Sequence, residues 1–405
     1  MAQTPNICLN RRGFLTGVSA SFASWAMLPR IASAAGAPDP RFLTVILRGA
    51  LDGLAAVAPI GDPHFTQLRP EEADMVGLSA MDGLFALNPA LKHVGTMFER
   101  GEAMAVHAVA TAYRGRSHFD GQDVLESGYG EHRRADSGWL NRALASMPGS
   151  GTVESASGLA VGPTVPLILR GEAPVTAWGP QAHADPSADT VARLLALYAD
   201  TDPRLHDVLE AGLRIDETVS VGDMMGDAPV RGLERTFVEA ARGAGRLLAD
   251  PAGPRVGALS YDGWDTHAND GVLNGRLFRQ LSALDAALNA LREEMAEVWD
   301  RSVIAVVTEF GRTASENGSS GTDHGTASAM FLLGGAVKGG RVLADWPGLA
   351  ANQLHEGRDV APTTDMRAVL MGVLQDHLGL DRRELMRTFP DATNLEPVKG
   401  LVRAI

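Results

Sequence analysis

The chain has 405 residues, 45% of them hydrophobic, a proportion typical of a globular protein rather than a disordered one. Its formal net charge of −13 at pH 7 excludes a broad basic surface of the kind that binds nucleic acid or an anionic membrane. We therefore do not expect a nucleic-acid-binding protein. No run of apolar residues is long enough to cross a bilayer, so we do not expect an integral membrane protein either.

The N-terminus has the order of features found in export signals. Arg11 and Arg12 precede Gly-Phe-Leu, an apolar stretch follows over residues 18–28, and residues 32–34 (Ala-Ser-Ala) are small enough for signal peptidase. This pattern resembles the twin-arginine signal. We therefore predict a signal peptide over residues 1–34, recognition by the twin-arginine machinery, and a periplasmic or secreted mature protein. A plain secretory signal or an anchor helix is the alternative.

The cysteine content limits the chemistry of any metal site. The single cysteine, Cys8, lies within the predicted signal, so the mature chain has no thiolate ligand and no disulfide. Proteins exported in the folded state often carry a metal or another cofactor. Any such metal must be held here by histidine, carboxylate or hydroxyl groups.

Strands and helices are predicted to alternate along the mature chain. Short apolar runs rich in β-branched residues predict buried strands, and apolar residues at three- and four-residue intervals predict helices. The strands are expected at 42–47, 104–109, 302–307 and 329–333, and the helices at 274–299 and 364–378. This alternation favours a three-layer α/β/α sandwich with a mostly parallel central sheet.

The domain boundaries follow from the same pattern. One α/β domain is expected over residues 38–405. Within it, residues 148–255 are less regular, with Gly, Pro and Ala spread throughout. They are interpreted as a possible cap or insertion, or as further helices of the sandwich.

Polar clusters follow or precede the predicted strands. In open α/β sheets, ligands bind in the loops beyond the carboxyl ends of the strands. Four clusters adjoin predicted strands and a fifth precedes the helix predicted over 274–299. They contain Asp52, the segment 113–120 (YRGRSHFD), the segment 261–267 (YDGWDTH), the segment 308–313 (TEFGRT) and the segment 321–325 (GTDHG). Their agreement in position predicts a shared site at one edge of the sheet.

The strings RSHFD, GWDTH, TEFGRT and GTDHG resemble domain of unknown function family 1501, which is related to the alkaline phosphatase and sulfatase superfamily. The resemblance implies an alkaline phosphatase-like fold that holds one or two metal ions. It also implies a nucleophile at Ser117 and places Phe310 where the two-metal enzymes have a histidine. The metal ligands that it implies are Asp52, Asp265, His267, Glu309 and His324.

Several of these residues have a second interpretation. Ser117 and Asp120 fit a helix N-terminal signature, so Ser117 is either a nucleophile or a cap. Asp52 precedes Gly53 and fits a turn equally well. Glu309 needs a partner if it is buried, either a metal or Arg312.

The remaining site residues surround the predicted nucleophile. Arg114 and Arg116 are expected to clamp an anion, and His118 to act as a ligand or general acid. Arg312 is either an anion contact or the partner of Glu309. Asp323 is expected to orient His324 or to cap its turn. By contrast, His107 stands within an apolar strand and reads as a core residue.

These residues predict an exported metal-dependent hydrolase of phosphate or sulfate esters, acting on a small anionic ester. Imidazole and carboxylate ligands without thiolates favour Zn²⁺ or Mn²⁺. The alternative is a non-catalytic exported protein that binds a ligand or a partner on the same fold.

Overall fold

The computed structural model describes residues 39–74, 77–147, 158–180 and 232–403, with scattered positions between 191 and 213. The predicted signal peptide, residues 1–34, lies outside these residues. Across the described part of the chain, every helix is too short or too polar to span a membrane.

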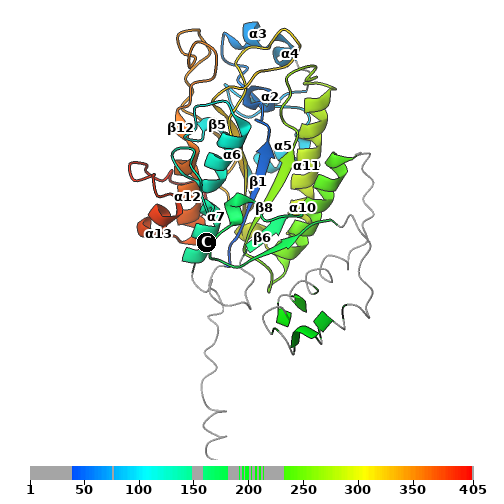
Figure 1. The fold of residues 1–405 in the computed structure, drawn as a ribbon. Coiled ribbons are helices and arrows are strands. Elements are labelled where there is room, and N and C mark those ends of the chain that lie inside the picture. The colour runs from blue at the N-terminus through cyan, green and yellow to red at the C-terminus, as the bar shows by residue number, and fades with distance from the viewer. Residues whose placement is uncertain are drawn as a thin grey trace, which may run out of the picture. The chain divides into compact units, whose positions relative to one another are not determined.

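A large sheet forms the middle layer of the described domain (Figure 1). Its strands lie in the order β11-β5-β10-β9-β1-β8-β6-β7, and β12 also pairs with β5. The strands are β1 (Arg41–Arg48), β5 (Ala103–Ala110), β6 (Gly158–Val161), β7 (Val175–Trp178), β8 (Val256–Asp262), β9 (Ser302–Thr308), β10 (Ser328–Leu333), β11 (Val342–Leu343) and β12 (Thr364–Asp365).

The sheet is mostly parallel. Strand β1 pairs in parallel with β8 and β9, and β6 pairs in parallel with β7 and β8. Strand β10 runs antiparallel to both β5 and β9. The carboxyl ends of β1, β5, β8 and β9 therefore lie at one edge of the sheet, and the start of β10 lies at that same edge.

Helices cover both faces of the sheet (Figure 1). One apolar cluster joins the sheet to helices α5, α10 and α11, and the other joins it to α6, α7, α12 and α13. Their bounds are α5 (Lys92–Glu99), α6 (His118–Ser127), α7 (Trp139–Ser146), α10 (Leu233–Ala249), α11 (Arg276–Glu294), α12 (Met366–Leu378) and α13 (Arg382–Thr388). The predicted three-layer sandwich is thus confirmed.

The sequence of β1 shows why its strand is buried on both faces. Side chains alternate between the two faces of a strand. Leu43 and Val45 enter the cluster with α10 and α11, whereas Phe42 and Ile46 enter the cluster with α7 and α12. A continuous apolar run is the pattern of a strand covered on both sides.

The predicted elements match the observed ones closely at four strands and two helices. Strands 42–47, 104–109, 302–307 and 329–333 correspond to β1, β5, β9 and β10. The helix predicted over 274–299 ends earlier, at Glu294, and is followed by a short 3-10 turn, Trp299–Arg301. Strand β8, which leads to Asp265, was not predicted.

The described parts of residues 148–255 belong to the sandwich itself. Strands β6 and β7 extend the central sheet beside β8, and α10 packs on α11. The segment that connects β6 to β7 contains a 3-10 turn, Leu167–Leu169, which belongs to the same apolar cluster as α7. The rest of the possible cap or insertion lies outside the described residues.

A second, smaller sheet follows β1. It has the order β2-β4-β3, and three short helices lie beside it in the chain. These elements are β2 (Val57–Ala58), β3 (Ser79–Ala80), β4 (Ala86–Leu87), α2 (Gly53–Ala56), α3 (Phe65–Leu68) and α4 (Pro70–Ala73).

Candidate metal centre

Loops from four parts of the chain meet at the carboxyl edge of the large sheet. Asp265 and His267 follow β8, His118 begins α6, His324 lies in the loop that leads into β10, and Gly49 follows β1. The loops approach one another closely at two glycines. A Cβ on Gly49 would lie 2.5 Å from the backbone nitrogen of Asp265, and one on Gly325 would lie 2.3 Å from the carbonyl carbon of Arg312.

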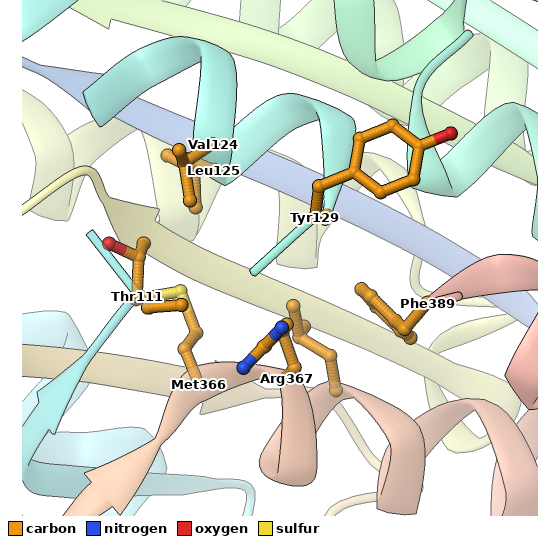
Figure 2. A pocket seen from close by; sticks show the side chains of 10 residues that line it. Thr111, Val124, Leu125, Tyr129, Met366, Arg367 and Phe389 are labelled. Carbon is orange, nitrogen blue, oxygen red and sulfur yellow. The ribbon is translucent and has the colours of Figure 1, made fainter. Parts of the chain in front are cut away.

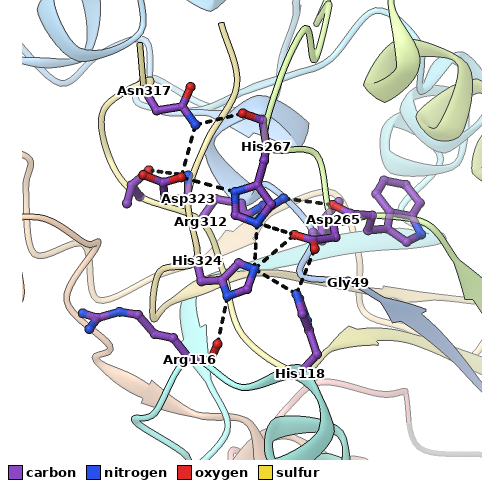
Figure 3. A network of polar contacts seen from close by, with 12 residues as sticks. Gly49, Arg116, His118, Asp265, His267, Arg312, Asn317, Asp323 and His324 are labelled. Atoms are coloured by element: carbon purple, nitrogen blue, oxygen red, sulfur yellow. Dashed lines mark hydrogen bonds and ion pairs between the residues drawn. The ribbon is translucent and has the colours of Figure 1, made fainter. Parts of the chain in front are cut away.

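Three imidazole rings and one carboxylate converge where these loops meet (Figure 3). The Nε2 atom of His324 lies 3.0 Å from Nε2 of His118 and 2.9 Å from Nε2 of His267. Asp265 Oδ1 lies 3.1 Å from His324 Nε2 and 3.0 Å from His267 Nε2, and its Oδ2 lies 3.4 Å from His118 Nε2. His118, Asp265 and His324 form a group that could hold a metal ion.

The opposite nitrogen of each ring has an acceptor of its own. His118 Nδ1 contacts Glu309 Oε1 at 2.8 Å, His267 Nδ1 contacts Asp323 Oδ1 at 3.2 Å, and His324 Nδ1 contacts the carbonyl of Arg116 at 2.8 Å. A carboxylate or carbonyl oxygen can only accept, so each Nδ1 is assigned as the protonated nitrogen. In the neutral rings, three Nε2 lone pairs then face one point, as they do in metal-binding histidines.

Arg312 holds Asp265 in place. Its Nη1 lies 3.0 Å from Asp265 Oδ1, and its side chain is fully buried. Partial burial opposes ionisation of Asp265, but Arg312 and the three histidines outweigh it and lower the pKa of this carboxyl. Arg312 was predicted to be an anion contact or the partner of Glu309. The structure pairs it with Asp265 rather than Glu309, and the anion-contact role stays a prediction.

Glu309 lies behind His118 and holds its ring. Its Oε1 accepts from His118 Nδ1, from the backbone N–H of Gly49 at 2.8 Å and from Gln122 Nε2 at 3.2 Å. Burial opposes ionisation of Glu309, and the hydrogen bond from His118 leads the contacts that lower its pKa. The same hydrogen bond raises the pKa of His118. Predicted as a ligand, Glu309 is placed by the structure one contact away from the converging nitrogens.

Asp52 does not join this cluster. Its Oδ1 accepts from the backbone N–H groups of Leu54 and Ala55, both at 3.1 Å, and so caps helix α2. Its Oδ2 pairs with Arg69 Nη1 at 2.8 Å, and both side chains are buried. Both carboxylate oxygens are therefore already occupied by the fold.

Ser117 caps helix α6. Its Oγ accepts from the backbone N–H of Asp120 at 3.5 Å. This contact agrees with the prediction that Ser117 caps a helix. Its immediate neighbours, Arg116 and His118, both contribute to the cluster. The nucleophile role of Ser117 stays a prediction.

The two arginines predicted to clamp an anion have other partners. Arg114 Nη1 donates to the backbone carbonyls of Thr111 and Tyr113. Arg116 Nη2 pairs with Glu356 at 2.7 Å and with Asp359 at 2.9 Å, and its guanidinium points away from the histidines in Figure 3. In this structure Arg116 contributes its backbone carbonyl to the cluster rather than its charge.

Asp323 and His107 were predicted to orient a ligand histidine and to lie in the core, respectively. Asp323 orients His267 rather than His324, and Asn317 Nδ2 supports it at 3.2 Å. His107 is a core residue as predicted. It is fully buried, its Nε2 contacts the carbonyls of Gly53 and Val57, and burial lowers its pKa to about 4.

Sequence reasoning missed the residues that support Glu309. Arg48 Nη1 donates to Gln122 Oε1 at 2.7 Å, which turns the amide NH₂ of Gln122 toward Glu309. Arg48 also pairs with buried Glu126 at 2.5 Å. The available signal was the helix period, since Gln122 lies four residues after His118 and so shares one face of α6 with it.

A small pocket between α6 and α12 is separate from this cluster (Figure 2). Its walls are mostly apolar, and Arg367 is the charged residue among them. The ten lining residues are Thr111, Ala112, Val124, Leu125, Gly128, Tyr129, Met366, Arg367, Leu370 and Phe389. Because no predicted site residue lines it, the pocket is not assigned to the candidate metal centre.

Comparison with protein families gives a match over most of the chain. Residues 75–389 match the family described as "Protein of unknown function (DUF1501)". The chain belongs to this family. The match includes the segments that carry His118, Asp265, His267 and His324, whereas Asp52 lies before it.

Solved structures give weaker likenesses. The crystal structure of Ps i-CgsB in complex with k-i-k-neocarrahexaose has 10% identity and a TM-score of 0.40, with 88% of this chain and 77% of that chain covered. The PsFucS1 sulfatase from Pseudoalteromonas sp. has 11% identity and a TM-score of 0.31, with 82% of this chain and 68% of that chain covered. The alkaline phosphatase of the Antarctic bacterium TAB5 has 11% identity and a TM-score of 0.34, with 76% of this chain and 95% of that chain covered. No curated protein matches the chain.

Proposed function

We propose that this protein is an exported, metal-dependent hydrolase of phosphate or sulfate esters. In this proposal a divalent ion, Zn²⁺ or Mn²⁺, is held by His118, Asp265, His267 and His324. The observation that carries it is the direction of the three rings. Each Nδ1 faces an acceptor, so the three Nε2 lone pairs meet one another and a carboxylate.

The donor set fits such an ion. The Nε2 lone pairs of neutral rings 2.9 and 3.0 Å apart repel one another unless a metal ion or a proton is shared between them. Imidazole nitrogen and carboxylate oxygen are common ligands of Zn²⁺, and the absence of cysteine from the described residues is consistent with this chemistry. When bound, such an ion polarises an ester oxygen and lowers the pKa of a bound water.

The protein's own residues have defined tasks in this proposal. Asp265 and the three imidazoles bind the divalent ion, and Arg312 keeps Asp265 ionised and in place. Glu309 and Asp323 keep the protons of His118 and His267 on Nδ1, which leaves Nε2 free to bind. Export by the twin-arginine route, in the folded state, is part of the same proposal and rests on Arg11 and Arg12.

Metal content and turnover test the proposal. The purified full chain, loaded with Zn²⁺ or Mn²⁺, is analysed for bound metal and assayed on an aryl phosphate, a phosphodiester and an aryl sulfate. We expect about one tightly bound ion per chain and hydrolysis of at least one ester, because the four donors form one site. Both should be lost in His324→Ala.

His93→Ala is the matched control. His93 Nδ1 also contacts a carboxylate, Asp285 Oδ2 at 2.7 Å, but this pair lies on α5 and α11 and away from the cluster. A wild-type protein without bound metal would mean that shared protons hold the rings together, and would refute the proposal. Bound metal without turnover of any ester would support the non-catalytic binding role, which the engaged side chains of Arg114 and Arg116 also favour.

A further inference from the structure

His324 is held differently from the other two histidines of the cluster. The Nδ1 atoms of His118 and His267 face carboxylates, whereas that of His324 faces the backbone carbonyl of Arg116 at 2.8 Å. A backbone carbonyl has no freedom of its own, so its position depends on what fixes the chain around Arg116.

The side chain of Arg116 connects that segment to a buried carboxylate. Arg116 Nη2 lies 2.9 Å from Asp359 Oδ2, and Thr326 Oγ1 donates to the same oxygen at 2.9 Å. Asp359 is fully buried, whereas Glu356, the second partner of Arg116, is largely exposed. Ion pairs at exposed positions contribute little, so Asp359 is the partner that fixes Arg116.

The same carboxylate also reaches the backbone of His324. Arg358 Nε lies 2.9 Å from Asp359 Oδ1, and Arg358 Nη2 donates to the carbonyl of His324. Isolated backbone bridges pair Arg312 with His324 and Thr313 with Asp359 in the same region. One buried carboxylate thus connects, through two arginines, to the acceptor of the His324 ring and to the His324 backbone.

We infer that Asp359 is the positioning residue of His324. Through Arg116 it places the carbonyl that receives Nδ1–H, and through Arg358 it fixes the loop from which the ring projects. None of the sequence strings that resemble the family contains Asp359, and Asp359 does not directly follow a strand. Its consequence for metal affinity rests on the proposed function, whereas its effect on the ring of His324 does not.

The tautomer of His324 provides a readout that needs no metal. In the metal-free full chain with ¹⁵N-labelled histidine, at about pH 8, where ordinary histidines are neutral, we expect His324 to be protonated at Nδ1. In Asp359→Asn the carbonyl of Arg116 loses its fixed position, so the Nε2-protonated form should appear. Zn²⁺ affinity, measured by chelator competition, should fall about 10- to 100-fold.

Two controls separate positioning from general destabilisation. Glu356→Gln removes the charge of the exposed partner of Arg116 and should leave both readouts unchanged. Asp62→Asn alters another buried carboxylate, which accepts from Trp346 and Leu349 and has no contact with His324. It should lower stability without changing the His324 tautomer or the Zn²⁺ affinity.

Arg358→Ala covers the case in which Asp359→Asn does not fold. Arg358 is 43% exposed, so its removal should be tolerated, and it breaks the contacts to Asp359 and to the His324 carbonyl together. Wild-type tautomer and affinity in the folded variants would overturn the inference. A wild-type chain that binds no Zn²⁺, with a tautomer that still changes in Asp359→Asn or Arg358→Ala, would refute the metal centre and leave the positioning role intact.

Discussion

Asp52 and Asp265 are two aspartates at the carboxyl edge of the same sheet, each paired with a buried arginine, and they end in opposite roles. Asp52 gives one oxygen to the α2 backbone and the other to Arg69. Asp265 gives Arg312 one contact from Oδ1, while both of its oxygens also face imidazoles.

Position after a strand is therefore not enough to make an aspartate a metal ligand. Both aspartates follow adjacent parallel strands, β1 and β8. They differ in how many of their carboxylate oxygens are already engaged by the backbone or by a buried arginine. A fully engaged carboxylate such as Asp52 stabilises the structure, and a partly engaged one such as Asp265 can still bind.

The largest effect is expected at Asp265. In Asp265→Asn the amide keeps an acceptor for Arg312 but loses the charge that faces the imidazoles. Structural zinc binding of 10–16 kcal/mol shared among four ligands gives about 3 kcal/mol for one, or a loss of roughly a hundredfold or more in affinity. Chelator competition measures this loss, and an unchanged affinity would remove Asp265 from the site.

Asp52 should show the converse. Asp52→Ala removes the cap of α2 and one partner of the buried guanidinium of Arg69, so the free energy of unfolding should fall by about 3 kcal/mol. Metal affinity should stay at the wild-type value. Denaturant unfolding and chelator competition on the same protein test both parts, and a large loss of affinity would restore Asp52 as a ligand.

Glu309 tests the intermediate case of a carboxylate that acts through another residue. Glu309→Gln should lower metal affinity about tenfold, because the neutral amide holds Nδ1–H of His118 less strongly. Asp62→Asn is the control, because Asp62 is a buried carboxylate that accepts from Trp346 and Leu349 and shares no partner with Glu309. Equal losses in the two variants would mean that the effect is one of general packing.

Ser117 should give the smallest effect. In Ser117→Ala, loss of the α6 cap should lower the free energy of unfolding by about 1 kcal/mol. If Ser117 acts only as a cap, ester hydrolysis should stay within about tenfold of wild type, measured as kcat/KM on the best substrate. A loss of about a thousandfold at unchanged stability would instead identify Ser117 as the nucleophile.

The sequence predicted the fold better than the site. The segments of β1, β5, β9 and β10 are mostly apolar, so they were visible without coordinates. Strand β8, with the sequence VGALSYD, carries Gly and Ser within its apolar run, and its burial depends on neighbours from distant parts of the chain. Asp265 and His267 were nevertheless found, because the string GWDTH that contains them resembles family 1501.

The separation of ligands from supporting residues was not visible in the sequence. Glu309 and Asp52 have the right type and the right position, but their hydrogen-bond partners, Gly49 and Arg69 among them, decide what their oxygens can still do. Similarly, Arg116 was selected for its charge and contributes a carbonyl. Such choices depend on the direction of a side chain, which one chain segment does not determine.

The order of the amino acids was enough to predict the layered α/β architecture, the edge at which polar residues gather and the absence of thiolate chemistry from the residues after the predicted signal. These follow from periodicity and composition, which are local properties. Which polar groups remain unengaged there depends on tertiary contacts. Each acceptor oxygen is taken by a nearby backbone N–H or buried cation, and partners such as Gly49 for Glu309 come from segments far away in the chain.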